Sequence, residues 1–155
     1  MRLLLFLFVL SLVGISCSSI SEPTVERIQN VKIESFSQTK VSATADMVLR
    51  NDNAVTLDLS AADLVAIVDG IEVATIKQNY DMTMQANAES NMPMSLDIDL
   101  QKIYDSMGDT MEKMNMAMQL YSKRELLIQF KGTIKVGRGS AKLSVPIDKE
   151  ELVKF

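Results

Sequence analysis

The sequence predicts a mainly β protein, an antiparallel β-sandwich of about seven strands with one inserted amphipathic helix. Apolar and polar residues alternate with period two over most of the chain after residue 30, which is typical of strands with one buried face. Polar turn residues interrupt this alternation at regular spacing, and a single stretch after Leu100 changes to a helical period. This pattern favours a sandwich with a helical insertion.

The chain begins with a segment that predicts export. Met1 and Arg2 precede an almost unbroken apolar run to Val13, and small residues lead to Cys17, the single cysteine. A basic start, a short apolar run and a small-residue exit are typical of a signal peptide, and the run is too short for a transmembrane helix. The segment resembles a bacterial lipoprotein signal with its lipobox. The resemblance implies a lipidated Cys17; an ordinary cleaved signal with a spare thiol and an uncleaved anchor are the alternatives.

Three segments follow from this interpretation. We expect a lipoprotein signal peptide over 1–16, a lipidated tether over 17–24 and one sandwich domain over 25–155. Ser18 directly after the cysteine resembles the residue found there in lipoproteins of the outer membrane more than in those retained in the inner membrane. We therefore expect a protein of the bacterial cell envelope, held by its acyl anchor on the periplasmic side of the outer membrane.

Composition excludes several classes of function. The formal charge is −4, or −5 once Arg2 is removed with the signal, and no polybasic run is present; nucleic-acid binding needs clustered cations. The chain has no histidine, which removes Ser-His-Asp and Cys-His sites and the commonest zinc ligand. An enzyme would have to work with carboxylates alone, and the pattern turns these outward. We expect no enzymatic activity and no cofactor.

The first strands are predicted at 31–34, 41–49, 55–59, 64–68 and 71–76. Asn51, Asp52 and Asn53 interrupt the alternation and predict a loop, because Asx residues tolerate left-handed backbone and cap their own turns. Asp69 and Gly70 separate two β-branched runs. This pair is the strongest hairpin signal in the chain, since a type I′ turn needs positive φ at both central residues.

The later strands are predicted at 80–84, 92–100, 126–136 and 141–147, with a loop at 89–91 and a charged tail over 149–155. Pro93 lacks an amide proton, which predicts an edge strand or a strand entrance. Gly132 predicts a bulge.

A helix is predicted from about Leu100 to Tyr121, because its apolar residues recur every three or four positions. This stripe consists of Ile103, Met107, Met111, Met114, Met118 and Tyr121. Gly108 weakens the helix and predicts a break there.

Residues 41–100 resemble a type 2 late-embryogenesis-abundant domain, also called the WHy domain. The shared features are an alternating strand that ends at Asn51-Asp52-Asn53, where the family has an Asn-Pro-Asn-like turn, and an apolar strand followed by the Asp69-Gly70 hairpin. The strand from Leu126 also fits. The resemblance implies an immunoglobulin/fibronectin III-like sandwich with one helix, no catalytic residues and a link to stress tolerance.

Nine of the eleven methionines lie between Met82 and Met118. Thioethers are soft ligands, so these residues allow an alternative function as a periplasmic Cu(I) or Ag(I) carrier. Its candidate ligands are Met82, Met84, Met114, Met116 and Met118. Core packing explains most of them better, because flexible methionine fills irregular gaps. Asp52, Asp97 and Asp99 are better explained as solvated residues than as a calcium site, since no EF-hand spacing is present.

The sequence thus predicts a non-enzymatic, lipid-anchored binding, structural or stress-protective module. Its partners would be the membrane lipid and an unidentified protein or apolar ligand, with an edge strand or the surface beside the helix as the docking site.

Overall fold

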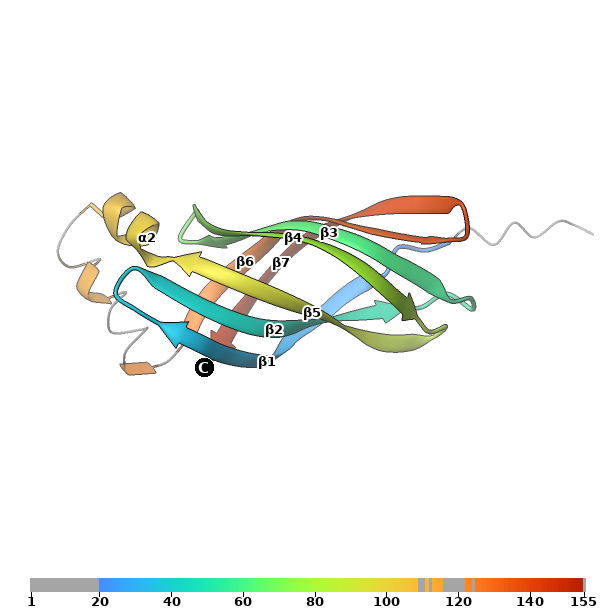
Figure 1. The fold of residues 1–155 in the computed structure, drawn as a ribbon, viewed down its shortest axis with the longest axis horizontal. Helices are drawn as coiled ribbons and strands as arrows, with labels where there is room; N and C mark the ends of the chain where they lie inside the picture. Colours follow the sequence, from blue (N-terminus) through green and yellow to red (C-terminus); the bar gives the residue numbers. More distant parts are fainter. Residues whose placement is uncertain (1–19, 109–110, 112, 116–121, 124, 155) are drawn as a thin grey trace, which may run out of the picture.

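The computed structural model describes residues 20–108, 111, 113–115, 122–123 and 125–154. Seven strands form two antiparallel sheets, one with the order β1-β2-β5 and one with the order β4-β3-β6-β7 (Figure 1). The strands are β1 (Thr24–Phe36), β2 (Lys40–Asn51), β3 (Leu57–Val68), β4 (Ile71–Met84), β5 (Ala88–Asp99), β6 (Glu125–Arg138) and β7 (Ala141–Lys154). This arrangement confirms the predicted immunoglobulin/fibronectin III-like sandwich.

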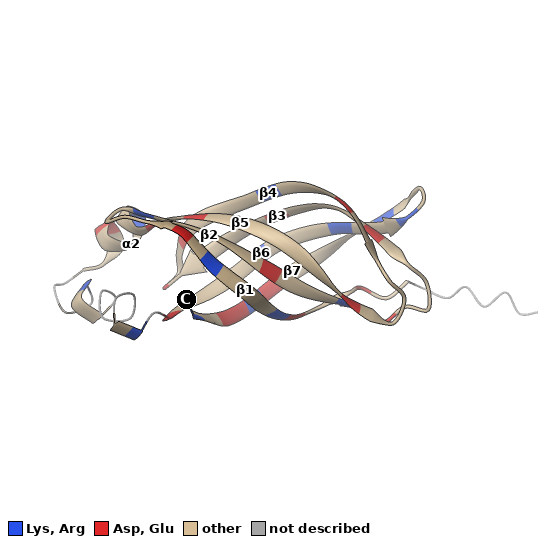
Figure 2. Cartoon of the chain, turned by 60° about the horizontal axis from the view of Figure 1, so that its bottom comes forward, with Lys and Arg blue, Asp and Glu red and all other residues tan. Residues whose placement is uncertain are grey.

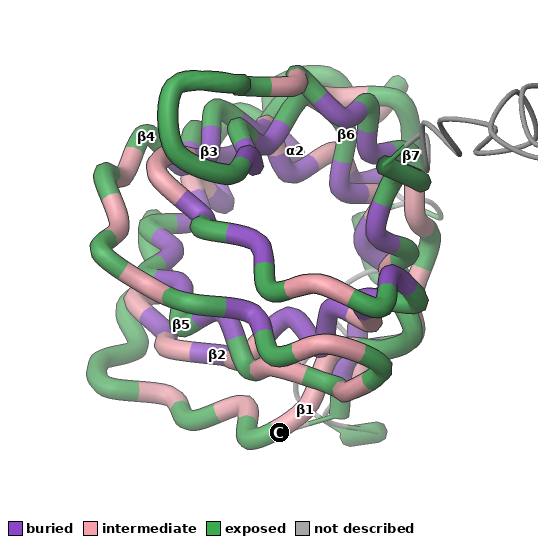
Figure 3. Tube along the Cα trace, turned by 90° about the vertical axis from the view of Figure 1, so that its right-hand side faces the viewer, coloured by how far each residue is buried: buried purple, intermediate pink, exposed green. Residues whose placement is uncertain are grey.

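The core lies between the two sheets because the alternating apolar residues of each strand turn toward the opposite sheet. In the end-on view, buried positions line the space between the sheets and exposed positions lie outside it (Figure 3). Met47, Leu57 and Met92 are fully buried there. On one side the edge strands β4 and β5 meet, and the hydroxyl of Tyr80 donates a hydrogen bond of 2.7 Å to the carbonyl of Pro93. Pro93 therefore lies on an edge strand, as predicted.

The strands are longer than the sequence predicts. Segments 55–59 and 64–68 contribute to one strand, β3, and 71–76 and 80–84 form one strand, β4. The predicted loop at 89–91 belongs to β5, and the predicted tail from 149 belongs to β7 up to Lys154. Polar residues such as Asp63, Lys77 and Glu89 occupy ladder positions with exposed side chains, so they extend the strands. These four predictions were wrong.

The two glycine predictions had different outcomes. Asp69 and Gly70 both have positive φ, 48° and 79°, which confirms the tight hairpin turn between β3 and β4. Gly132 is not at a bulge, since the β3–β6 and β6–β7 ladders run through it without a register shift. Instead it has a φ of 148°, and a Cβ there would overlap the backbone of Asp63 and Leu64.

The described helix is short. Helix α2 (Leu100–Ser106) begins after Asp99, whose carboxylate accepts hydrogen bonds from the amides of Gln101 and Lys102, and its C-cap is Met107. The prediction of a continuous helix from 100 to 121 was therefore wrong, whereas the predicted break does fall beside Gly108.

The helix stripe does not pack as predicted. Ile103 is buried and Met107 is half-buried, but Met111 and Met114 are 61% and 55% exposed. The prediction that these two methionines face the core was wrong, because the chain has left the sheets before it reaches them. Met116, Met118 and Tyr121 lie outside the described residues.

Candidate binding site

An apolar cavity lies between the sheets in the half of the sandwich nearest α2. Its volume is about 30 Å³, and every side chain on its wall is apolar. The wall is formed by Ile28, Val31, Ile33, Val41, Ala43, Ala45, Leu96, Ile98, Leu100, Leu126, Ile128, Phe130 and Val153. Both sheets contribute, so any group held there would be enclosed from two sides.

Strand β1 builds its part of the wall with an irregular pattern. Its inward residues are Val25, Ile28, Val31 and Ile33, which are spaced by three, three and two positions. The β1–β2 ladder has three register shifts, and Asn30 has a φ of 55°. Each extra residue reverses the alternation of the strand. The bulges therefore keep apolar side chains inward where regular period two would turn some of them outward.

The cavity is least covered along β1. Ile28, Val31 and Ile33 are half-buried, whereas the cavity residues of β2 are buried. No residue of β1 is buried. Since β1 ends one sheet and β7 ends the other, the side between these two edges is the natural entrance.

Two charged residues stand at this entrance. Lys149 pairs with Phe130 and Glu151 pairs with Ile128 across the β6–β7 ladder. Directly opposed residues share a face of the sheet, so both half-buried charged side chains lie on the face that carries the cavity wall. Neither forms an ion pair with any residue that the structure describes. The rim thus offers one positive and one negative group beside an apolar interior.

The titratable groups with shifted pKa values lie outside the cavity wall. Burial raises the pKa of Tyr80 to about 12. The hydrogen bond from Arg27 lowers the pKa of the exposed Glu89. Hydrogen bonds from Ser42 and Lys40, in that order, lower the pKa of Asp97. Over the described ranges, no three His, Cys, Asp or Glu side chains are close enough to share a metal ion.

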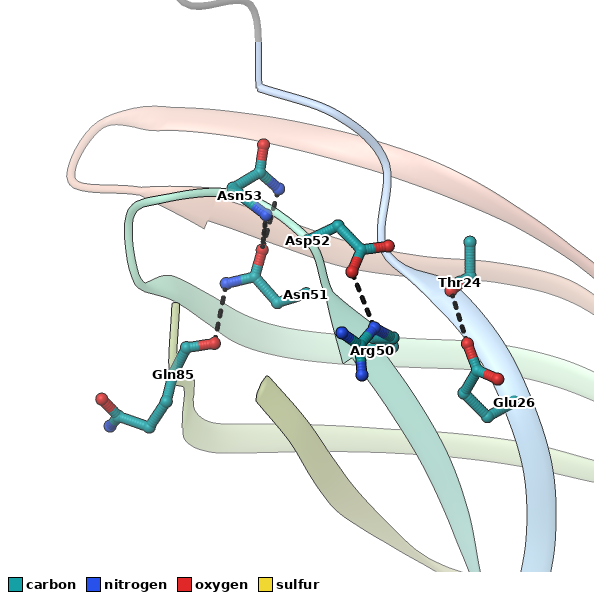
Figure 4. Close-up of polar contacts among 7 residues, drawn as sticks. All are labelled: Thr24, Glu26, Arg50, Asn51, Asp52, Asn53 and Gln85. Carbon is teal, nitrogen blue, oxygen red and sulfur yellow. Dashed lines mark hydrogen bonds and ion pairs between the residues drawn. The ribbon is translucent and has the colours of Figure 1, made fainter. Parts of the chain in front are cut away.

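The two asparagines of the predicted Asn51-Asp52-Asn53 turn form a buried polar cluster at the opposite end of the sandwich (Figure 4). The Asn51 side chain is fully buried, and its Nδ2 lies 2.9, 3.3 and 3.0 Å from the carbonyl oxygens of Val55, Met84 and Gln85. Its Oδ1 accepts hydrogen bonds from the backbone and side-chain nitrogens of Asn53.

The other two residues of this turn face different partners. Asp52 is exposed and pairs with Arg50 at 2.7 Å. Asn53 exchanges two hydrogen bonds with the backbone of Ser21, which belongs to the predicted tether. The local sequence predicted the asparagines only as turn formers. Their partners are backbone groups up to 34 residues away, and no local pattern shows such contacts.

The described methionines among the proposed soft-metal ligands do not all lie at the same end of the sandwich. Met82 is half-buried and Met84 is fully buried in β4. Met84 lies at the Asn51 end, whereas Met114 follows α2 at the other end. The 11 residue steps of β2 separate these ends by roughly 35 Å, so Met84 and Met114 do not share one site.

The leader and Cys17 lie outside the described residues. Among the helices of the described part, none is long and apolar enough to span a bilayer.

No family model matches the chain, and no curated protein matches it. Solved structures share its fold. A solution structure from Arabidopsis thaliana matches with a TM-score of 0.61 and 9% identity, and the match covers 91% of this chain and 89% of that chain. A crystal structure from Archaeoglobus fulgidus has a TM-score of 0.53 at 12% identity, with 85% and 98% covered. These similarities concern the fold alone.

Proposed function

We propose that the protein is a non-enzymatic, lipid-anchored binding module of the cell envelope that takes an apolar chain between its two sheets. The single observation that carries this proposal is the cavity, because its wall is wholly apolar and its β1 side is incompletely covered. A wall of this kind provides dispersion contacts and excludes water, but it offers no polar group that would fix a hydrophilic substrate. We take a fatty acyl chain as the ligand class.

Binding requires β1 to move outward. A cavity of about 30 Å³ has room for only about two water-sized groups, which is far less than an acyl chain needs. Strand β1 is the wall that yields most readily, since it pairs with one neighbour only and its ladder is interrupted three times. Its displacement would open the cavity while the ladders of the other sheet stay intact.

A cavity-filling substitution tests the proposal. We expect myristate to shift the NMR methyl signals of Ile28, Val41 and Leu96, which are on the wall. Ala43→Leu adds bulk to the cavity and should abolish these shifts. Met92→Leu is the matched control, because Met92 is buried away from the wall and the exchange conserves volume. Shifts that persist in Ala43→Leu, or no shifts in the unsubstituted protein, would contradict the proposal.

The anchor and the family are further parts of the proposal. The signal segment and Cys17 support attachment to the outer membrane, facing the periplasm. The strand order and the Asn51-Asp52-Asn53 turn support a relation to type 2 late-embryogenesis-abundant domains. A deletion strain should then survive drying less well than its parent, and complementation with a Cys17→Ser chain should not restore survival. Equal survival of parent and deletion strains would remove the stress-protective part.

A further inference from the structure

Ser21, in the described part of the predicted tether, is hydrogen-bonded to one end of the sandwich. The amide of Ser21 donates a hydrogen bond of 2.7 Å to Oδ1 of Asn53, and Nδ2 of Asn53 donates one of 2.8 Å to the carbonyl of Ser21. Asn53 is itself held by the buried Asn51. Cys17 precedes Ser21 by four residues, so their Cα atoms lie within about 14 Å of each other. The attachment point therefore stays near this end.

The same end carries a basic hairpin, formed by residues 133–147 of β6 and β7 (Figure 2). Its charged residues are Lys135, Arg138 and Lys142, and it contains no Asp or Glu. All three are exposed, and none is in an ion pair with a residue in the described part of the chain. Residues 22–25 lie beside 145–149 of β7, which places the start of β1 next to this hairpin (Figure 1).

Other charges near this end are of both signs. Arg27 pairs with Glu89 at 2.9 Å, and Arg50 pairs with Asp52 at 2.7 Å. Three acidic residues without an ion pair to a described residue also lie at this end but outside the hairpin: Glu22 beside residues 145–149, Glu26 in β1, and Asp58, which pairs with Gly137 across the β3–β6 ladder. The hairpin is therefore a local concentration of positive charge on a chain whose formal net charge is −4.

We propose that this basic hairpin contacts the anionic phospholipid headgroups of the membrane that holds Cys17. The proposal rests on the lipid anchor of the proposed function, which brings the hairpin within reach of the headgroups. Anionic surfaces attract basic groups within about one Debye length, roughly 10 Å in 0.1 M salt. With this end on the membrane, α2 and its half of the cavity point away from the bilayer, at the far end of strands of 12 to 14 residues.

Energy transfer from the protein to the membrane surface tests the orientation. The processed, acylated protein is reconstituted into vesicles of phosphatidylcholine, with or without about 30% phosphatidylglycerol, that carry an acceptor on labelled headgroups. A donor is attached at Ser140→Cys on the hairpin or at Gln38→Cys in the turn between β1 and β2. We expect higher transfer from position 140 than from position 38, and an increase at 140 when phosphatidylglycerol is present.

Charge reversal distinguishes headgroup contact from tethering alone. Arg138→Glu with Lys142→Glu should remove the increase caused by phosphatidylglycerol, and so should about 0.5 M salt. Lys102→Glu with Lys154→Glu is the matched control, because it makes the same change in net charge at the opposite end. Transfer that ignores lipid charge, or that falls equally in both double variants, would overturn the hairpin contact. Intact mass of the same sample tests the anchor separately, and a mass without acyl chains would overturn the anchor and this inference together.

Discussion

Replacing Asn51 by alanine should destabilise the fold more than any other single polar truncation in the described part of the chain. The side chain is fully buried and has contacts with three carbonyl oxygens and two nitrogens. Nδ2 has two hydrogens, so it satisfies two carbonyls at a time, and Oδ1 accepts two bonds from Asn53. Four bonds at about 1 kcal/mol each give a loss of about 4 kcal/mol in the free energy of unfolding.

Urea denaturation of a chain that begins at Ser18 measures this loss. With a slope of about 2 kcal/mol per molar urea, the midpoint should fall by about 2 M. Asn91→Ala is the matched control, because Asn91 is exposed in β5 and accepts one surface hydrogen bond. Its change should stay within about 0.5 kcal/mol. Equal midpoints for the two variants would refute the reasoning that the buried amide holds the loops together.

Single substitutions at Tyr80, Gly132 and Ser42 each test one local contact. Tyr80→Phe should lower the free energy of unfolding in urea by about 1 kcal/mol, because it removes a hydrogen bond that joins the sheets; an unchanged free energy would contradict this. Ultraviolet titration of the unsubstituted protein should show this phenol ionising near pH 12. Gly132→Ala should lower the free energy of unfolding by more than 2 kcal/mol and Gly70→Ala by about 1 kcal/mol. Both glycines have positive φ, but only at Gly132 would the added Cβ meet neighbouring backbone. Equal losses would show that this backbone contact is unimportant. Ser42→Ala should raise the pKa of Asp97 toward its ordinary value, measured by carboxyl NMR, and an unchanged titration would exclude this hydrogen bond as the main cause. Because the pKa of Asp97 is lower in the folded protein, its ionised carboxylate stabilises the fold above the ordinary pKa near 4, and this stabilisation is lost as pH falls through the folded pKa.

Local patterns predicted the features that depend on local physics. The Asp69-Gly70 turn, the alternation of β2 and the edge position of Pro93 each follow from the backbone preferences of a few adjacent residues. The break at Gly108 has the same origin.

Features that depend on distant partners were missed. The spacing of Val25, Ile28 and Val31 imitates a helix, and only pairing with β2 shows that bulges produce it. The stripe with Met111 and Met114 has a helical period, but the period does not show whether a sheet lies opposite. Of the candidate site, the sequence predicted the apolar inward faces. It did not predict which end of the sandwich has the cavity, because that depends on how side chains from both sheets pack together.

Mass spectrometry of the native protein, extracted in detergent from its own membrane, tests the central claim most directly. We predict that the denatured protein begins at Cys17 and carries covalent acyl chains. Under native conditions it should have the additional mass of a bound apolar molecule, which Ala43→Leu removes. A free thiol at Cys17 and identical native and denatured masses would contradict both the anchor and the binding module.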